Sequence, residues 1–130
     1  MIKDEYPHSA LTLKIIGYAM EVHKALGNGF QEVIYQRSLE YEFGLQNLQS
    51  SREHVMPVFY KGIHVGTRRV DFLVENCISV ELKAVIVLED VHFAQAINYL
   101  EAYNLQVGLL LNFGARSLEY KRLHNKKYRL

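Results

Sequence analysis

RRVDFLVENCISVELKA, residues 68–84 of this 130-residue chain, is the stretch that decides the fold. Its second half, residues 78–84, alternates apolar and polar side chains, a pattern typical of a β-strand with one chemical face. Residues 69–74 predict a strand before it, and residues 75–76 predict the turn between the two. Because side chains two residues apart share a face, Glu81 and Lys83 point the same way. Adjacent strands therefore bring both residues toward Asp71.

These three charged side chains suit a metal site. Charges on an otherwise apolar strand are costly to bury unless they are paired or bind a metal. Carboxylate oxygens are the ligands that Mg²⁺ and Mn²⁺ prefer, so we expect Asp71 and Glu81 to hold such an ion, with the backbone carbonyl of Leu82 as a further ligand. Lys83 would position or deprotonate the water that the metal activates. An ordinary Glu-Lys pair on an exposed sheet face is the alternative that spacing alone leaves open.

The rest of the chain predicts helices around these strands. The expected elements are a helix over 10–26 with Ser9 as its N-cap, a helix over 32–43 stopped by Gly44, a strand over 55–60, a turn at 61–62 with a short run at 63–66, strands over 69–74 and 78–84, a helix over 89–103 and a strand over 106–113. Residues 118–123 can add an edge strand. The order α-α-β-β-β-α-β predicts one α/β domain over residues 1–130, with a central mixed sheet flanked by helices.

Composition excludes several classes of protein. No segment approaches the roughly 20 apolar residues of a membrane span, and the acidic N-terminus is unlike a secretory signal. We therefore expect a cytoplasmic protein without a membrane partner. The single cysteine, Cys77, excludes an internal disulfide and a multi-thiolate zinc site, and is expected to be a small core residue.

Charge is distributed unevenly along the chain. The net charge of +1 does not by itself indicate a nucleic-acid binder. Residues 116–130, however, carry six cations against one acid, a net +5, whereas residues 1–50 carry six acids against four cations, a net −2. This asymmetry would let one face meet phosphates. A solvated basic tail explains it equally well.

The segment GFQEVIY, residues 29–35, spells G-x-x-E-x-x-Y. Together with EVHKALGNGFQE, RVDFLVEN, VELKAV and VGLLLNFG, in that order over nearly the whole chain, it resembles the GxxExxY protein family, a branch of the PD-(D/E)XK nuclease superfamily. The resemblance implies a restriction-endonuclease-like α-β-β-β-α-β core. It also implies that Glu32 joins Asp71 and Glu81 at the metal and that Lys83 is catalytic. Val70 stands where the superfamily name has proline.

Further residues are candidates for substrate contact or for supporting the site. Gln95 to Tyr99 resembles a Q-x-x-x-Y motif of RecB-type members, and His92, Gln95 and Tyr99 share one helical face, from which they could contact nucleic acid or orient Lys83. Packing of Tyr99 and solvation of Gln95 is the alternative.

Three more candidates have purely structural alternatives. His23 lies where the family pattern also has a histidine and could support Glu32. Tyr35, three residues after Glu32, is expected to pack and orient it. Arg69, with its neighbour Arg68, could meet a phosphate, or both could be solvated hairpin charges.

The sequence thus predicts a nuclease that depends on Mg²⁺ or Mn²⁺ and acts on nucleic acid, with DNA favoured over RNA. The resemblance implies cleavage that leaves a 5′-phosphate. Two alternatives stay open: a catalytically silent module that binds nucleic acid or protein, and a resolvase-like homodimeric endonuclease for branched DNA.

Overall fold

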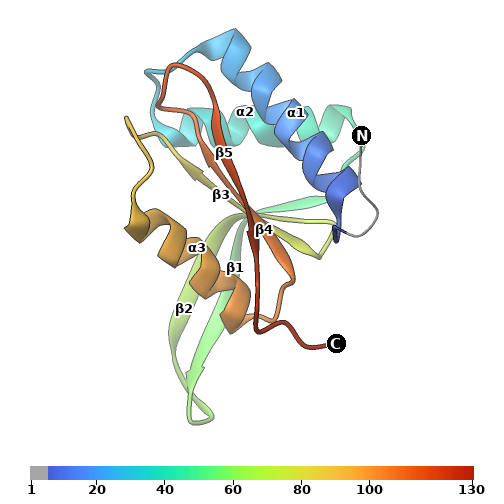
Figure 1. The fold of residues 1–130 in the computed structure, drawn as a ribbon, viewed down its shortest axis with the longest axis vertical. Helices are drawn as coiled ribbons and strands as arrows, with labels where there is room; N and C mark the ends of the chain where they lie inside the picture. Colours follow the sequence, from blue (N-terminus) through green and yellow to red (C-terminus); the bar gives the residue numbers. More distant parts are fainter. Residues whose placement is uncertain (1–5) are drawn as a thin grey trace.

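The computed structural model describes residues 6–130, which form three helices and a five-stranded sheet (Figure 1). The elements are α1 (Ser9–Leu26), α2 (Glu32–Leu45), β1 (Ser50–Tyr60), β2 (Ile63–Val74), β3 (Ile78–Lys83), α3 (Asp90–Ala102), β4 (Val107–Asn112) and β5 (Glu119–His124). The strands lie in the order β1-β2-β3-β4-β5, and only β3 and β4 are parallel. The expected α/β class with a mixed sheet is confirmed, and so is the edge strand near the end of the chain.

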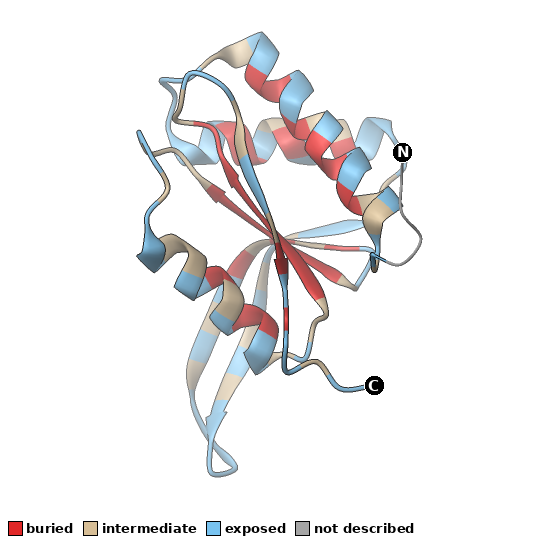
Figure 2. Cartoon of the chain, in the orientation of Figure 1, coloured by how far each residue is buried: buried red, intermediate tan, exposed pale blue. Residues whose placement is uncertain are grey.

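The centre of the sheet is formed by β3 and β4. All residues of β4 and all but the last residue of β3 are buried (Figure 2). Parallel neighbours need a crossover, and α3 supplies it. A strand that is covered on both faces has apolar side chains at nearly every position, so apolar and polar residues do not alternate along residues 107–112.

Helices cover both faces of this centre. Leu109 and Leu111 pack in the main core with α1, α2, β2 and β3, whereas Leu110, between them, packs with α3 and β5. Successive side chains of a strand point to opposite faces, so α1 and α2 lie on one side of the sheet and α3 lies on the other. Cys77 is partly buried against the main core, as expected.

The β1–β2 hairpin projects from this body (Figure 1). No residue from 50 to 69 is buried. Lys61 and Gly62 both have positive φ, 49° and 79°, the backbone that two-residue hairpin turns require. The predicted strand starts at residues 55 and 69 were wrong, because an exposed hairpin has no buried face to impose a pattern. Its backbone ladder nevertheless continues to Ser50 and Ile63.

Helix ends differ from the prediction in two places. Ser9 is the first residue of α1 rather than its N-cap, which is His8. Gly44 lies inside α2 instead of stopping it, since a glycine costs a helix only about 1 kcal/mol. The left-handed residue after this helix is Asn47, with φ 57°.

The remaining boundaries shift by one residue. The predicted ends of the third helix, Glu89 and Tyr103, are the caps of α3. β3 and β4 are shorter than predicted, and β5 lies one residue later. Within residues 6–130, no helix is both long enough and apolar enough to cross a membrane.

Candidate active site

The site forms where β2 and β3 separate. The antiparallel pairing of these strands ends at Phe72 opposite Val80. One step further, Asp71 comes opposite Glu81, and here the backbone N–H of Leu82 donates to Asp71 Oδ2 at 2.8 Å. The aspartate side chain thus accepts a bond from the edge of the neighbouring strand. The two predicted acids lie at this fork.

The other oxygen of Asp71 is held by α2. Gln36 Nε2 donates to Asp71 Oδ1 at 2.8 Å, and Arg52 Nη1 donates to Gln36 Oε1 at 3.0 Å. Because both ends of the amide are engaged, its NH₂ group must face the carboxylate. Gln36 is buried. Sequence reasoning missed it, although it lies one helical turn after Glu32 on the same face.

Glu81 is paired with an arginine. The glutamate is only 6% exposed, and Arg68 Nη2 lies 3.1 Å from Glu81 Oε1. The same Nη2 donates to the carbonyl oxygen of Gln95 at 3.1 Å, and the guanidinium carbon lies 5.5 Å from the ring centroid of Tyr99. Arg68 therefore ties β2 and β3 to α3, and its cation faces Glu81 instead of solvent.

We call Glu32, Asp71 and Glu81 the acidic cluster. Burial raises the pKa of all three carboxyls, and it is the largest cause for each. The negative charge of Asp71 further raises the pKa of Glu32 and of Glu81, which shows that the three charges act on one another. The positive charge of Lys83 lowers each of the three pKa values. Lys83 is thus within electrostatic reach of the whole cluster.

The cluster fits the chemistry of a divalent cation. Its donors are carboxylate oxygens, the ligands that Mg²⁺ and Mn²⁺ prefer, and their repulsion would be relieved by a positive ion. An ionised carboxylate offers about four lone-pair sites, of which the hydrogen bonds described above occupy two on Asp71 and one on Glu81. As the side chains stand, no three His, Cys, Asp or Glu residues within 6–130 are close enough together to hold a metal.

A pocket of about 240 Å³ opens beside Asp71. It is lined by Glu32, Val33, Gln36, Glu53, Arg69 and Asp71. Glu53, with a positive φ of 53°, is the third acid of this lining, after Glu32 and Asp71, and its charge raises the pKa of Asp71. Arg69 Nη1 lies 3.9 Å from Glu53 Oε2 and is mostly exposed. Sequence reasoning missed Glu53 because it read residues 46–54 as a polar connection.

Tyr35 explains much of the G-x-x-E-x-x-Y spacing. Its hydroxyl donates to the carbonyl of Gly27 at 2.6 Å and accepts from the N–H groups of Gly29 and Phe30 at 3.0 and 3.1 Å. The buried tyrosine therefore fixes the loop that leads into α2 and hence the position of Glu32.

His23 lies behind the same tyrosine. Its Nε2 is 3.0 Å from the carbonyl oxygen of Ala115, and its ring contacts Phe113, which stacks on Tyr35 with centroids 4.7 Å apart. No hydrogen bond or ion pair joins His23 to Glu32 in the part of the chain that the structure describes. Its place is in the aromatic stack that supports the loop.

The predicted face of α3 reaches the site only in part. Tyr99 is buried, and burial raises its pKa to about 12. Gln95 is exposed and contributes its backbone carbonyl to Arg68. His92 instead caps the helix, because its Nδ1 accepts the backbone N–H of Glu89 at 2.9 Å.

Comparisons with known proteins agree with this architecture. A family model described as the PD-(D/E)XK nuclease superfamily matches residues 9–123. Among solved structures, the chain is similar to one titled "Crystal structure of SSO0001", with a TM-score of 0.57 and 18% sequence identity. The similarity covers 72% of this chain and 50% of that one, so the chain spans half the length of that protein, and at this identity it shows the fold alone. No curated protein matches the chain.

Proposed function

Because the chain belongs to the PD-(D/E)XK nuclease superfamily, we propose that it is a metal-dependent nuclease that hydrolyses phosphodiester bonds of nucleic acid, with DNA as the favoured substrate. Within the superfamily, the spacing of Gly29, Glu32 and Tyr35 favours the GxxExxY branch. The observation that carries the proposal is the fork between β2 and β3, where the half-buried carboxylate of Asp71 and the buried carboxylate of Glu81 lie beside a lysine.

The residues at the fork would share the work of binding the metal and orienting the water. A bound Mg²⁺ or Mn²⁺ would supply a Lewis acid for the scissile phosphate and acidify a water molecule. Asp71 and Glu81 would hold the ion, with Glu32 from α2 and the carbonyl of Leu82 as further oxygen ligands. Lys83, on the same strand face as Glu81, would orient the attacking water.

The surrounding bonds prepare Asp71 for this role. Its two oxygens are aimed by the Gln36 amide and by the backbone of β3, so its rotamer is set before any ligand binds. Such outer partners raise the affinity of a metal site because they remove freedom that binding would otherwise cost. Arg69, exposed at the pocket beside Asp71, offers a cation for a substrate phosphate.

The test is cleavage of linear, single-stranded and branched DNA and of RNA in Mg²⁺ or Mn²⁺, with wild type beside Glu81→Ala. Glu81→Ala also leaves Arg68 without its partner, so a second variant is needed. Lys83→Met serves this purpose, because the side chain of Lys83 makes no hydrogen bond or ion pair with any residue from 6 to 130. We expect the wild type to cut at least one substrate, and both variants to lose most of the rate. The proposal is refuted if the wild type cleaves no substrate, or if both folded variants cleave as fast as the wild type.

A further inference from the structure

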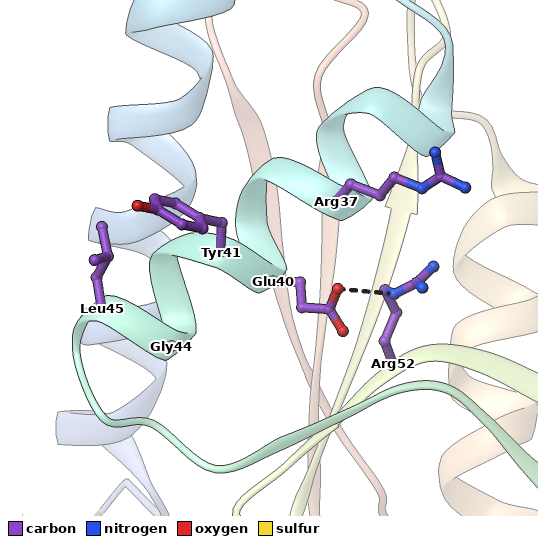
Figure 3. A pocket seen from close by; sticks show the side chains of 6 residues that line it. All are labelled: Arg37, Glu40, Tyr41, Gly44, Leu45 and Arg52. Carbon is purple, nitrogen blue, oxygen red and sulfur yellow. Dashed lines mark ion pairs between the residues drawn. The ribbon is translucent and has the colours of Figure 1, made fainter.

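A second pocket, of about 670 Å³, lies between α2 and the beginning of β1 (Figure 3). It is lined by Arg37, Glu40, Tyr41, Gly44, Leu45 and Arg52. Figure 3 shows that the two arginine side chains extend to the same side, whereas Tyr41 and Leu45 lie at the other end. The pocket therefore has a cationic end and an apolar end.

The cationic end carries an uncommitted positive charge. Arg37 is exposed and makes no hydrogen bond or ion pair with any residue from 6 to 130. Arg52 Nε lies 3.1 Å from Glu40 Oε1, an ion pair whose geometry leaves that N–H without a hydrogen bond. Two arginines against one glutamate leave this end with a net charge of +1. A guanidinium presents a planar fork of donors that matches a phosphate.

The apolar end is open to solvent. Tyr41 is 70% exposed and Leu45 is 58% exposed. Gly44, between them on α2, has no atom within 4 Å of the position that a Cβ would take. An exposed tyrosine ring and cationic side chains in one pocket are the combination that binds single-stranded nucleic acids, whose bases stack on the ring.

This pocket adjoins the acidic cluster. Arg37 follows Glu32 by five residues, about 7.5 Å along the helix axis and about 140° around it, so Arg52, bonded to Gln36, is the residue that brings the pocket next to the cluster. The chain of hydrogen bonds from Arg52 through Gln36 to Asp71 joins the two places directly. Tyr41 follows Arg37 by one turn of α2, about 40° around the axis, so both residues line the same side of the helix.

We propose that the pocket between α2 and β1 is a subsite for the nucleic-acid strand on one side of the scissile bond. Arg37 and Arg52 bind a backbone phosphate there, and Tyr41 stacks on a base without selecting its identity. The inference rests on the proposed function for its ligand and adds where the strand leaves the acidic cluster.

The experiment is binding of fluorescein-labelled single-stranded DNA in EDTA, followed by anisotropy over a range of salt concentrations. The variants are Arg37→Ala and Tyr41→Ala, and Lys14→Ala, an exposed cation on α1, is the matched control. Losing one phosphate contact should reduce the slope of log K against log salt by about 0.7 in Arg37→Ala. Tyr41→Ala should weaken binding about fivefold or more with an unchanged slope, because stacking releases no counterions. Lys14→Ala should match the wild type.

Two readouts separate this inference from the nuclease proposal. Loss of affinity in the two pocket variants supports the subsite even if the wild type cuts no substrate. If the wild type cuts DNA while Arg37→Ala and Tyr41→Ala bind and cut like it, the subsite is refuted and the nuclease stands. A wild type that binds no DNA also overturns the subsite, as does a concentration-dependent dimer that Tyr41→Ala abolishes, since a second copy would then fill the pocket.

Discussion

The pairing of Arg68 with Glu81 can be tested by removing the cation. At 3.1 Å and an effective dielectric constant of about 20, the attraction between the charges is about 5 kcal/mol. Removing one partner of a buried pair typically costs about 3–5 kcal/mol, because the other charge stays buried. The side chain of Glu81 is 7% exposed, but that of Arg68 is 27% exposed. We therefore expect Arg68→Met to lower the free energy of unfolding by about 3 kcal/mol, which for a domain of this size lowers Tm by roughly 10 °C.

Urea unfolding in EDTA measures this effect for Arg68→Met, Glu81→Gln and the double variant. Arg69→Met is the matched control, because Arg69 is exposed and lies 3.9 Å from its acid, a contact worth about 0–1 kcal/mol. The double-mutant cycle should give a coupling of about 2 kcal/mol. If Arg68→Met costs no more than Arg69→Met, Arg68 does not hold Glu81 and the reasoning fails.

The same variant should change the response to metal. A ligand that binds only the folded state stabilises it by RT ln(1 + [L]/Kd), so the rise in Tm grows with affinity and concentration. In Arg68→Met the arginine no longer competes with the ion for Glu81, so Mg²⁺ or Mn²⁺ should raise its Tm more than that of the wild type. An equal gain in both proteins would show that Arg68 and the ion do not meet at Glu81.

Three further predictions concern stability. Tyr35→Phe should lower the free energy of unfolding, measured by urea denaturation, by about 1–3 kcal/mol, because it leaves backbone groups around the Tyr35 hydroxyl unpaired. The control Tyr18→Phe should change this free energy little. Equal effects of the two variants would refute the role of the Tyr35 hydroxyl. Gly114→Ala should be strongly destabilising, because the added Cβ would lie 2.4 Å from the backbone nitrogen of Val85. Gly17→Ala, with open space around the added Cβ, should instead stabilise α1 by up to about 1 kcal/mol. Thermal unfolding measures both variants, and a Gly114→Ala protein as stable as the wild type would contradict the packing. The pKa values of the acidic cluster are raised, so its contribution to stability is complete below about pH 4 and is lost as pH rises through the raised values. The contribution of the cluster to the Tm in EDTA should therefore grow as pH falls from 7 toward 4, and a contribution that shrinks over this range would contradict the direction.

Much of the fold followed from local patterns. The strand over 78–84 was predicted because its apolar and polar side chains alternate with a period of two, although both of its faces are covered, and the run at 106–113 because it is almost entirely apolar. The exposed hairpin was missed in part, since residues 50–54 and 63–68 pack against little and so carry no such signal. Its length comes from backbone pairing, which does not depend on side-chain type.

The site was predictable only where residues are close in sequence or share a strand face. Asp71 and Glu81 followed from adjacent strands, and Glu32 came from the resemblance. Arg68 and Arg69 are neighbours of the same type, and only the packing of α3 decides that Arg68 turns inward to Glu81. Gln36 shares a helical face with Glu32, but its bond to Asp71 joins residues 35 apart in the chain, and a single sequence does not indicate that pairing.

The most direct test of the central idea, that Asp71 and Glu81 share one divalent cation, is Mn²⁺ titration by isothermal calorimetry. We predict saturable binding to the wild type, weakened at least about tenfold in Asp71→Asn and in Glu81→Gln. Glu21→Gln, an exposed acid on α1, should bind like the wild type. If the wild type binds no Mn²⁺, or if the site variants bind as tightly as Glu21→Gln, the proposed metal site does not exist.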